Sequence, residues 1–196
     1  FIAVFTARAK NIRIGRPFDE DAELGPLSSV ANMQRVLSYA DIVRDDGGEI
    51  LAGGNRVNGF ESGCYVEPTV ALAKDNKARV CQEELFGPFA TFLTFETEEE
   101  AIALGNDTRF GLAGYVWTEN LQRAMRVSDS LRSGYVLINS VMQREKNAPF
   151  GGFGHSGIDR EGGQSSLRFY SEGKATLIAC ENADISKMGM TSQDNH

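Results

Sequence analysis

Apolar side chains recur every three to four residues in two early stretches of the chain, which predicts amphipathic helices there. These helices are expected over residues 1–13 and 29–46, and Gly47 follows the end of the second. A capping box formed by Thr97 and Glu100 marks the start of another helix. Capping residues and helical spacing predict further helices over residues 78–84, 97–106, 118–131 and 164–170.

Short apolar runs between these helices predict β-strands. They fall at residues 49–52, 89–95, 113–117, 135–139 and 174–180. Residues 65–72 are rich in strand-forming side chains but contain Pro68, which favours an edge strand or an extended loop. Strands and helices alternate over residues 89–139, as in two consecutive right-handed βαβ units. We therefore expect an α/β fold with a parallel sheet covered on both faces, which the run at 174–180 need not join.

Composition and charge narrow the class of protein. The 196 residues are 41% hydrophobic and 24% charged, which is ordinary for a globular chain and argues against wholesale disorder. A formal net charge of −7 argues against binding to nucleic acid or to anionic membranes. No apolar run approaches the ~18 residues of a membrane span. The three cysteines have no zinc-ligand spacing and cannot form a closed disulfide set, which indicates a reducing, cytoplasmic setting.

Two adjacent carboxylates precede the strand expected at residues 89–95. Glu83 and Glu84 are neighbours in sequence, so their side chains point in different directions and only one can face a given pocket. A single carboxylate there could accept hydrogen bonds from ribose hydroxyls, or it could simply be a solvated surface group. Phe86, two residues further on, could belong to the core.

The glycine-rich run at residues 151–157 contains the pattern Gly-Gly-x-Gly-x-x-Gly. A Rossmann fingerprint needs such glycines between a first strand and a helix, with an acidic residue about 20 positions later. The run closes the sheet region instead, so a dense turn is the better interpretation. His155 within it has no Asp or Ser placed to complete a triad. Cys64 and Cys81 are expected to be small buried apolar residues rather than nucleophiles.

A charged loop lies between the strand expected at residues 135–139 and Phe150. It contains Arg144, Glu145 and Lys146. One interpretation is a loop whose charges face solvent. The other is that Arg144 binds the carboxylate of a substrate through a bidentate pair.

Motifs across most of the chain resemble those of the NAD(P)-dependent aldehyde dehydrogenase superfamily. They are, in order, GCYVEPTV, CQEELFGPF, NDTRFGLAGYVWT, GYVLINS, PFGGFGHSGIDREGG and FYSEGKATLI. The resemblance implies the three-layer catalytic domain of that family, with the domain portion at residues 1–171, an oligomerisation strand at 172–181 and a tail at 182–196. Arg144 and the segment DREGGQSSLRFYSE are most similar to the hydroxymuconic-semialdehyde-type enzymes.

The resemblance also assigns roles to individual positions. Glu84 matches the glutamate that binds the nicotinamide ribose, and Phe86 matches the aromatic residue beside the nicotinamide ring. Phe150 matches a wall of the aldehyde pocket, next to the substrate-anchoring loop that holds Arg144. The strand from Lys174 to Cys180, residues 174–180, matches the strand that crosses to a neighbouring subunit. These matches imply NAD or NADP as cofactor, a small aldehyde as substrate and a homo-oligomer as the assembly.

The family's cysteine nucleophile and its cofactor domain match nothing in this chain. Cys64 and Cys81 do not align with the nucleophile, so we assign no catalytic residue and no metal ligand here. Without a thiol the chemistry cannot start, and the chain alone is expected to be inactive and to bind no cofactor tightly. The alternative is a non-enzymatic truncated paralogue that keeps only the fold and the pairing strand.

Overall fold

The computed structural model describes residues 1–143 and 145–181. Its helices are α1 (Ile2–Lys10), α2 (Val30–Asp45), α3 (Arg79–Gln82), α4 (Glu98–Asn106), α5 (Leu121–Ser130) and α6 (Gly163–Phe169), with a 3₁₀ turn at Gly154–Ser156. Its strands are β1 (Glu49–Ala52), β2 (Thr69–Leu72), β3 (Phe89–Phe92), β4 (Ala113–Val116) and β5 (Tyr135–Ile138). Each of these elements lies within or beside a stretch where the sequence predicts one, and the mixed α/β class is confirmed.

The first sheet has the order β1-β2-β3, with β1 antiparallel and β3 parallel to β2. The expectation that residues 65–72 form an edge strand is therefore wrong, because β2 is the central strand. Pro68 immediately precedes β2, so its missing N–H removes no hydrogen bond from the sheet. Thr69, which begins the strand, donates its backbone N–H to the Pro88 carbonyl at 2.8 Å.

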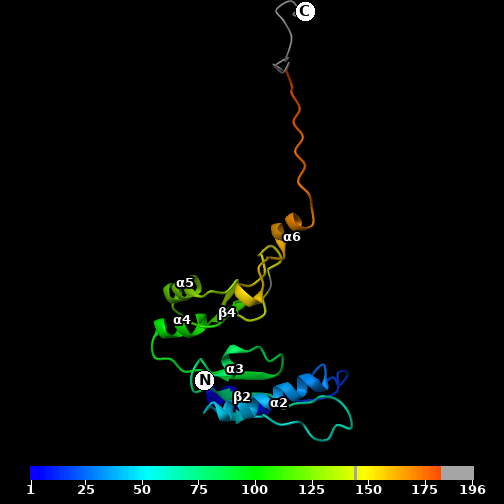
Figure 1. Cartoon of the computed structure of the whole chain (residues 1–196), viewed down its shortest axis with the longest axis vertical. Coiled ribbons are helices and arrows are strands. Elements are labelled where there is room, and N and C mark those ends of the chain that lie inside the picture. Colours follow the sequence, from blue (N-terminus) through cyan, green and yellow to red (C-terminus); the bar gives the residue numbers. More distant parts are fainter. Residues whose placement is uncertain (144, 182–196) are drawn as a thin grey trace, which may run out of the picture.

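The second sheet is the parallel pair β4-β5, joined through α5. Only one of the two expected βαβ units is therefore assigned within a single sheet, since β3 and β4 belong to different sheets. Figure 1 shows the two parts in sequence along the molecule: α1, α2 and the first sheet at one end, then α4, α5 and β4.

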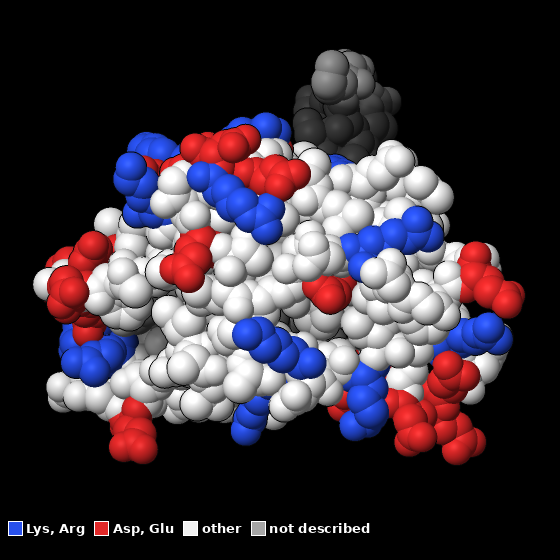
Figure 2. Space-filling model, turned by 90° about the horizontal axis from the view of Figure 1, so that it is seen from below, with Lys and Arg blue, Asp and Glu red and all other residues white. Residues whose placement is uncertain are grey.

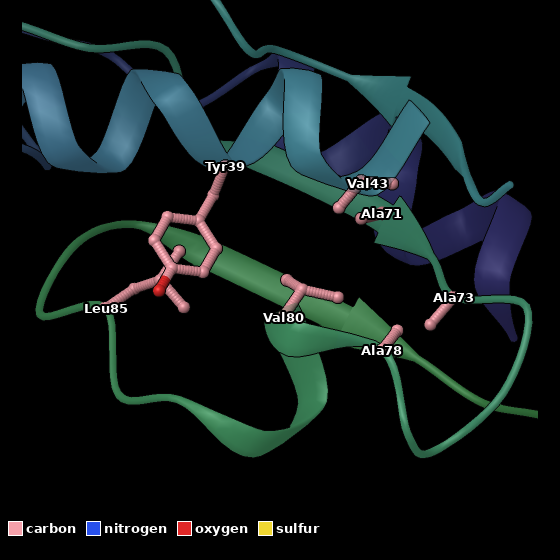
Figure 3. Close-up of a cluster of buried hydrophobic side chains, with 7 residues drawn as sticks. All are labelled: Tyr39, Val43, Ala71, Ala73, Ala78, Val80 and Leu85. Carbon is pink, nitrogen blue, oxygen red and sulfur yellow. The ribbon is translucent and has the colours of Figure 1, made fainter. Parts of the chain in front are cut away.

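The main buried cluster lies where α2 packs against the first sheet and α3 (Figure 3). Tyr39 and Val43 on α2 are 2% and 1% exposed, and Ala71 of β2 is 0% exposed. Its members are Tyr39, Val43, Ala71, Ala73, Ala78, Val80 and Leu85. Because Leu85 belongs to this cluster, the chain between α3 and β3 is held directly against the core.

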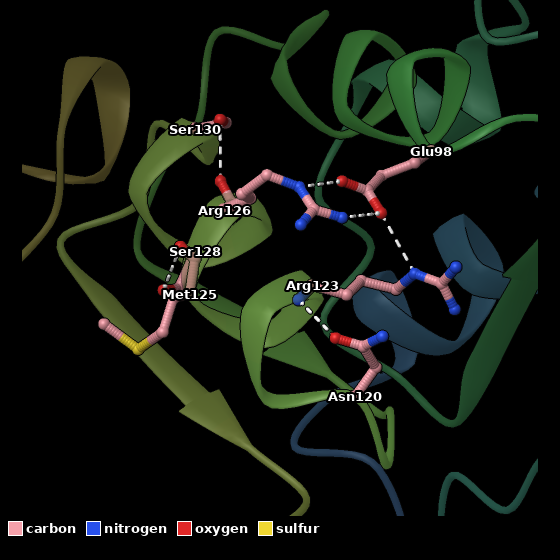
Figure 4. A network of polar contacts seen from close by, with 7 residues as sticks. All are labelled: Glu98, Asn120, Arg123, Met125, Arg126, Ser128 and Ser130. Atoms are coloured by element: carbon pink, nitrogen blue, oxygen red, sulfur yellow. Dashed lines mark hydrogen bonds and ion pairs between the residues drawn. The ribbon is translucent and has the colours of Figure 1, made fainter.

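Side-chain caps and one ion-pair group set the helix positions in the second part. Thr97 and Asn120 accept hydrogen bonds from Glu100 N and Arg123 N, at the starts of α4 and α5. The Glu98 carboxylate bridges the two helices by pairing with Arg123 at 3.0 Å and Arg126 at 2.9 Å (Figure 4). Hydrogen bonds and ion pairs from both arginines lower the pKa of Glu98, with Arg126 the main cause. This contact joins α4 to α5 across the surface.

Residues 172–181 leave the rest of the chain as an extended segment (Figure 1). The strand expected at residues 174–180 forms no β-ladder with the described part of the chain, so that prediction does not hold within one subunit. Leu177 and Ile178 in this segment are 93% and 80% exposed. The tail expected at 182–196 lies outside the described residues. Among the residues that are described, no helix is long and apolar enough to cross a membrane. Figure 2 shows acidic and basic side chains interspersed on the face that it presents, with uncharged surface between them.

Candidate functional site

The segment between α3 and β3 directs alternate side chains to opposite sides. Glu83 has an extended backbone, and along extended chain successive side chains point in opposite directions. Leu85 is 9% exposed and lies in the core, whereas Phe86 is 74% exposed and Glu84 is also exposed. Glu84 and Phe86 therefore point outward while Glu83 and Leu85 point inward. The expectation that the two glutamates face different ways is confirmed.

Glu83 is held by two partners from neighbouring helices. Its carboxylate accepts a short hydrogen bond from the Tyr39 hydroxyl and another from Arg79 Nε at 3.0 Å. The hydrogen bond from Arg79 is the main cause that lowers the pKa of Glu83 to about 2, and the bond from Tyr39 adds to it. Burial and the same carboxylate raise the pKa of Tyr39. The guanidinium groups of Arg79 and Arg35 lie 5.7 and 5.9 Å from the centre of the Tyr39 ring.

The backbone of this segment is held by α2. Arg35 Nη2 donates to the Glu84 carbonyl at 2.6 Å, and Asn32 Nδ2 donates to the Phe86 carbonyl at 3.0 Å. Phe86 has φ = 54°, a left-handed conformation that bulky residues rarely adopt. A Cβ on the following residue, Gly87, would lie 2.6 Å from the side chain of buried Val36, so only glycine fits against α2 there.

The exposed side of this segment, called the outward face below, carries the Glu84 carboxylate and, two residues later, the Phe86 ring. Within residues 1–143 and 145–181, no side-chain hydrogen bond or ion pair engages the Glu84 carboxylate, so both oxygens can accept hydrogen bonds from a ligand. A groove of about 510 Å³ adjoins the segment at Gly87 and Pro88 and continues between α1 and the first sheet. This face can bind a hydroxyl pair and cover a flat apolar ring.

Phe150 lies in the second part of the chain, next to β5. Its ring meets the Tyr135 ring edge-on at 5.7 Å, and its backbone exchanges hydrogen bonds of 2.7 and 2.8 Å with Glu161. Together with Leu112 and Phe169 it lines a cavity of about 440 Å³. Phe150 thus lies beside the second sheet, whereas Glu84 and Phe86 lie just before β3 of the first sheet. Arg144, the other substrate candidate, lies outside the described residues.

Asn139 fixes the start of the loop that leads to Phe150. Its side-chain oxygen accepts from Thr118 N at 2.9 Å, and its side-chain nitrogen donates to the Thr118 carbonyl at 2.8 Å. Its own backbone N–H donates to the Val116 carbonyl at 2.8 Å, and its φ is 51°. The Asn139 carboxamide therefore extends the hydrogen bonding between β4 and β5 by one residue beyond the strands, with its side chain in the role of a backbone peptide group.

The cysteines are free and differ in exposure: Cys64 and Cys81 are half-buried and Cys180 is exposed. Burial raises the pKa of the Cys81 thiol, and the charges of Asp75 and Asp46 raise it further. A raised pKa lowers the thiolate fraction, which makes Cys81 a poor nucleophile. The described residues contain no group of three or more metal-ligating side chains.

The contacts that position the outward face were not predicted from the sequence. Asn32, Arg35 and Tyr39 lie three to four residues apart and so share one side of α2. That spacing of polar side chains next to a buried apolar stripe was the available signal.

The chain belongs to the aldehyde dehydrogenase family, whose sequence profile matches residues 1–176. Its α/β structure, with parallel sheet elements, matches solved aldehyde dehydrogenases. The resemblance stated from the motifs is therefore confirmed.

Three similar proteins illustrate the relationship. A 2-aminomuconic 6-semialdehyde dehydrogenase of a Pseudomonas species is 44% identical over 176 residues, covering 88% of this chain and 36% of that protein. The betaine aldehyde dehydrogenase of Staphylococcus aureus, solved in complex with NAD+, is 40% identical with a TM-score of 0.83, covering 86% of this chain and 34% of that one. HpcC from Thermus thermophilus is 37% identical with a TM-score of 0.87, covering 96% and 38%. The chain thus spans little more than a third of the length of these relatives.

Proposed function

We propose that this chain is the part of an NAD(P)-dependent aldehyde dehydrogenase that holds the nicotinamide end of the cofactor and one wall of the aldehyde pocket. The complete enzyme oxidises an aldehyde to the acid. The observation that carries the proposal is the exposure of both Glu84 and Phe86, while Glu83 and Leu85 anchor the segment to the rest of the chain.

The residues on this face fit the nicotinamide riboside. The Glu84 carboxylate has two oxygens that can accept from the two ribose hydroxyls, and these hydrogen bonds are strengthened by its charge. The exposed Phe86 ring offers a flat apolar surface to the neighbouring nicotinamide. The bound cofactor supplies hydride acceptance, and this chain holds the acceptor ring in place. The NAD+ complex of the similar betaine aldehyde dehydrogenase supports the choice of cofactor class.

We propose that the isolated chain does not turn over aldehydes and binds the cofactor weakly. A thiolate must attack the aldehyde to begin covalent catalysis, and the raised pKa of Cys81 makes it unsuited to this task. The alternative is a non-enzymatic paralogue that keeps only the fold. A reading frame that continues upstream to a cysteine nucleophile and a cofactor domain supports the enzyme, and an isolated start codon supports the paralogue. The free cysteines support a reducing, cytoplasmic location for either.

The substrate is proposed to be a semialdehyde that carries a carboxylate. The 2-aminomuconic 6-semialdehyde dehydrogenase among the relatives supports this class, with Arg144 as the carboxylate partner and Phe150 as a wall. In the complete enzyme, Arg144→Ala should lower kcat/KM for carboxylate-bearing semialdehydes by roughly 30- to 150-fold, as expected for loss of a partly desolvated bidentate pair. Neutral aldehydes of equal length are the control and should be nearly unaffected. An equal loss of kcat/KM for both kinds of aldehyde would indicate that Arg144 has a structural role instead.

Residues 174–180 are proposed to pair with a second copy of the chain. The exposure of Leu177 and Ile178 supports this, because apolar side chains on an extended segment favour pairing with another strand. Sedimentation of the chain should show self-association at tens of micromolar, about the range of weak interfaces. A clean monomer there would contradict this assignment.

The central experiment replaces Glu84 by glutamine in the complete enzyme. Loss of charge-assisted hydrogen bonds should cost about 1.5–3 kcal/mol, mainly in hydride transfer, because the ring is then held less firmly. Single-turnover absorbance of the reduced cofactor measures this step directly. Glu119→Gln, at an exposed position in the loop before α5, is the matched control. An unchanged hydride-transfer rate in Glu84→Gln would remove Glu84 from the cofactor site.

A further inference from the structure

We infer that Arg35, on the far side of the segment from the cofactor face, is a positioning residue that fixes the orientation of Glu84 and Phe86 for hydride transfer. The inference rests on the proposed function, since it explains how that face is held. Arg35 itself touches the backbone of the segment, and no part of the inference requires it to touch cofactor or substrate.

One side of α2 contacts nearly every residue of the segment from behind. Tyr39 binds the Glu83 side chain, Arg35 binds the Glu84 carbonyl, and Asn32 binds the Phe86 carbonyl. The order of residues along the helix is the reverse of the order along the segment, so the two chains run antiparallel and the contacts form a row.

The conformation at Phe86 needs such support. A φ of 54° strains a non-glycine backbone, and such a conformation persists only when the surroundings over-determine it. The carbonyl anchors at Glu84 and Phe86 hold the peptide unit before Leu85 and the peptide unit after Phe86. If the anchor at Glu84 is lost, the backbone can relax toward ordinary φ values, and both outward side chains turn with it.

Arg35 is the strongest of these carbonyl anchors. Its 2.6 Å bond comes from a charged donor, and such bonds are shorter and roughly twice as strong as neutral ones. The guanidinium also lies over the Tyr39 ring at 5.9 Å, which restricts the rotamers of the Arg35 side chain. Arg35 is therefore pre-oriented toward the Glu84 carbonyl.

The first test uses the chain itself and does not depend on its activity. Chymotrypsin can cleave after Phe86 and after Phe18, whose side chain is 99% exposed and serves as an internal reference. Arg35→Met should raise the ratio of cleavage at Phe86 to cleavage at Phe18 by about 10-fold, the factor that a lost hydrogen bond supports. Arg44→Met is the matched control, because Arg44 lies on the same helix but pairs with Asp41 at 2.7 Å.

The second test uses the complete enzyme. Arg35→Met should lower kcat about 10- to 100-fold, because a misplacement near 1 Å costs up to that factor, while KM for the cofactor changes less than about threefold. Arg35→Lys keeps a charged donor and should recover part of the loss. A merely structural role would instead lower the amount of folded enzyme and leave kcat per folded molecule unchanged.

The outcomes separate this inference from the function on which it rests. An unchanged cleavage ratio in Arg35→Met overturns the inference. The inference is also overturned if Arg35→Met raises the cleavage ratio but keeps a normal kcat, while Glu84→Gln slows hydride transfer. If hydride transfer is normal in both Arg35→Met and Glu84→Gln, the proposed cofactor site itself is wrong. A raised ratio, a lowered kcat and partial recovery in Arg35→Lys support the positioning role.

Discussion

Replacing Glu83 by glutamine tests how firmly the segment before β3 is anchored. The substitution keeps the shape of the side chain but removes the charge that Arg79 and Tyr39 bind. A pKa of about 2 in place of 4.5 corresponds to at most about 3 kcal/mol of stability at neutral pH, at ~1.36 kcal/mol per pH unit. The Glu83 and Arg79 side chains are 30% and 58% exposed, so solvent screening reduces this to about 1–2 kcal/mol.

The pH dependence of this loss has a definite sign. The folded-state pKa of Glu83 is depressed, so its stabilisation is fully present above the unfolded pKa near 4.5 and is lost as pH falls toward 2. Glutamine does not titrate. The difference in unfolding free energy between the wild-type chain and Glu83→Gln should therefore be constant above about pH 5 and shrink steadily below it.

Urea unfolding followed by far-UV circular dichroism, at several pH values between 7 and 2.5, measures this difference. Glu119→Gln, at an exposed position, serves as the control and should show no such pH-dependent difference. A difference for Glu83→Gln that stays constant down to pH 2.5, or that is absent at pH 7, would refute the assignment of Glu83 as a charged anchor.

Two further predictions concern Cys81 and Asn139. Cys81 should react with a thiol reagent at pH 7 more slowly than exposed Cys180, because its raised pKa and half-burial reduce the accessible thiolate. Mass spectrometry of the labelled peptides measures the two reaction rates, and equal rates would contradict the prediction. Asn139→Ala should lower the unfolding free energy by about 1–3 kcal/mol, because it removes both side-chain bonds to Thr118 and leaves alanine at φ = 51°. Asn139→Gly, which relieves the backbone strain, should lose less, and equal losses in urea unfolding would show that strain plays no part.

Local signals in the sequence predicted most of the elements. Thr97 caps the helix at which it was expected, and Asn120 caps the helix expected over residues 118–131, because capping depends on residues only three positions apart. The position of a strand within a sheet depends on distant residues, which is why Pro68 favoured an edge strand or an extended loop where the central strand β2 begins. The pairing of residues 174–180 could not be derived within the chain for the same reason.

The candidate site was only partly predictable. Motifs pointed to Glu84, Phe86 and Phe150, but reasoning from residues alone allowed Phe86 to be a core side chain, and it is 74% exposed. Arg35 is separated from Glu84 by 49 positions, so nothing local links them. Periodicity on α2 marks a polar row, but only the folded chain shows which backbone that row contacts.

The three buried clusters all lie within residues 9–93, whereas Val116, Ala124 and Leu137 are the buried hydrophobic residues described beyond them. Free energies of local opening follow buried apolar contact, so the amides of β4 and β5 should exchange with solvent before those of β2. The proposed cofactor face at Glu84 thus adjoins the part of the chain expected to exchange slowly, and the proposed aldehyde wall at Phe150 belongs to the part expected to exchange fast. Under the proposed function, the cofactor side of the pocket would be rigid and the aldehyde side adjustable, so different aldehydes could be accommodated without disturbing the cofactor.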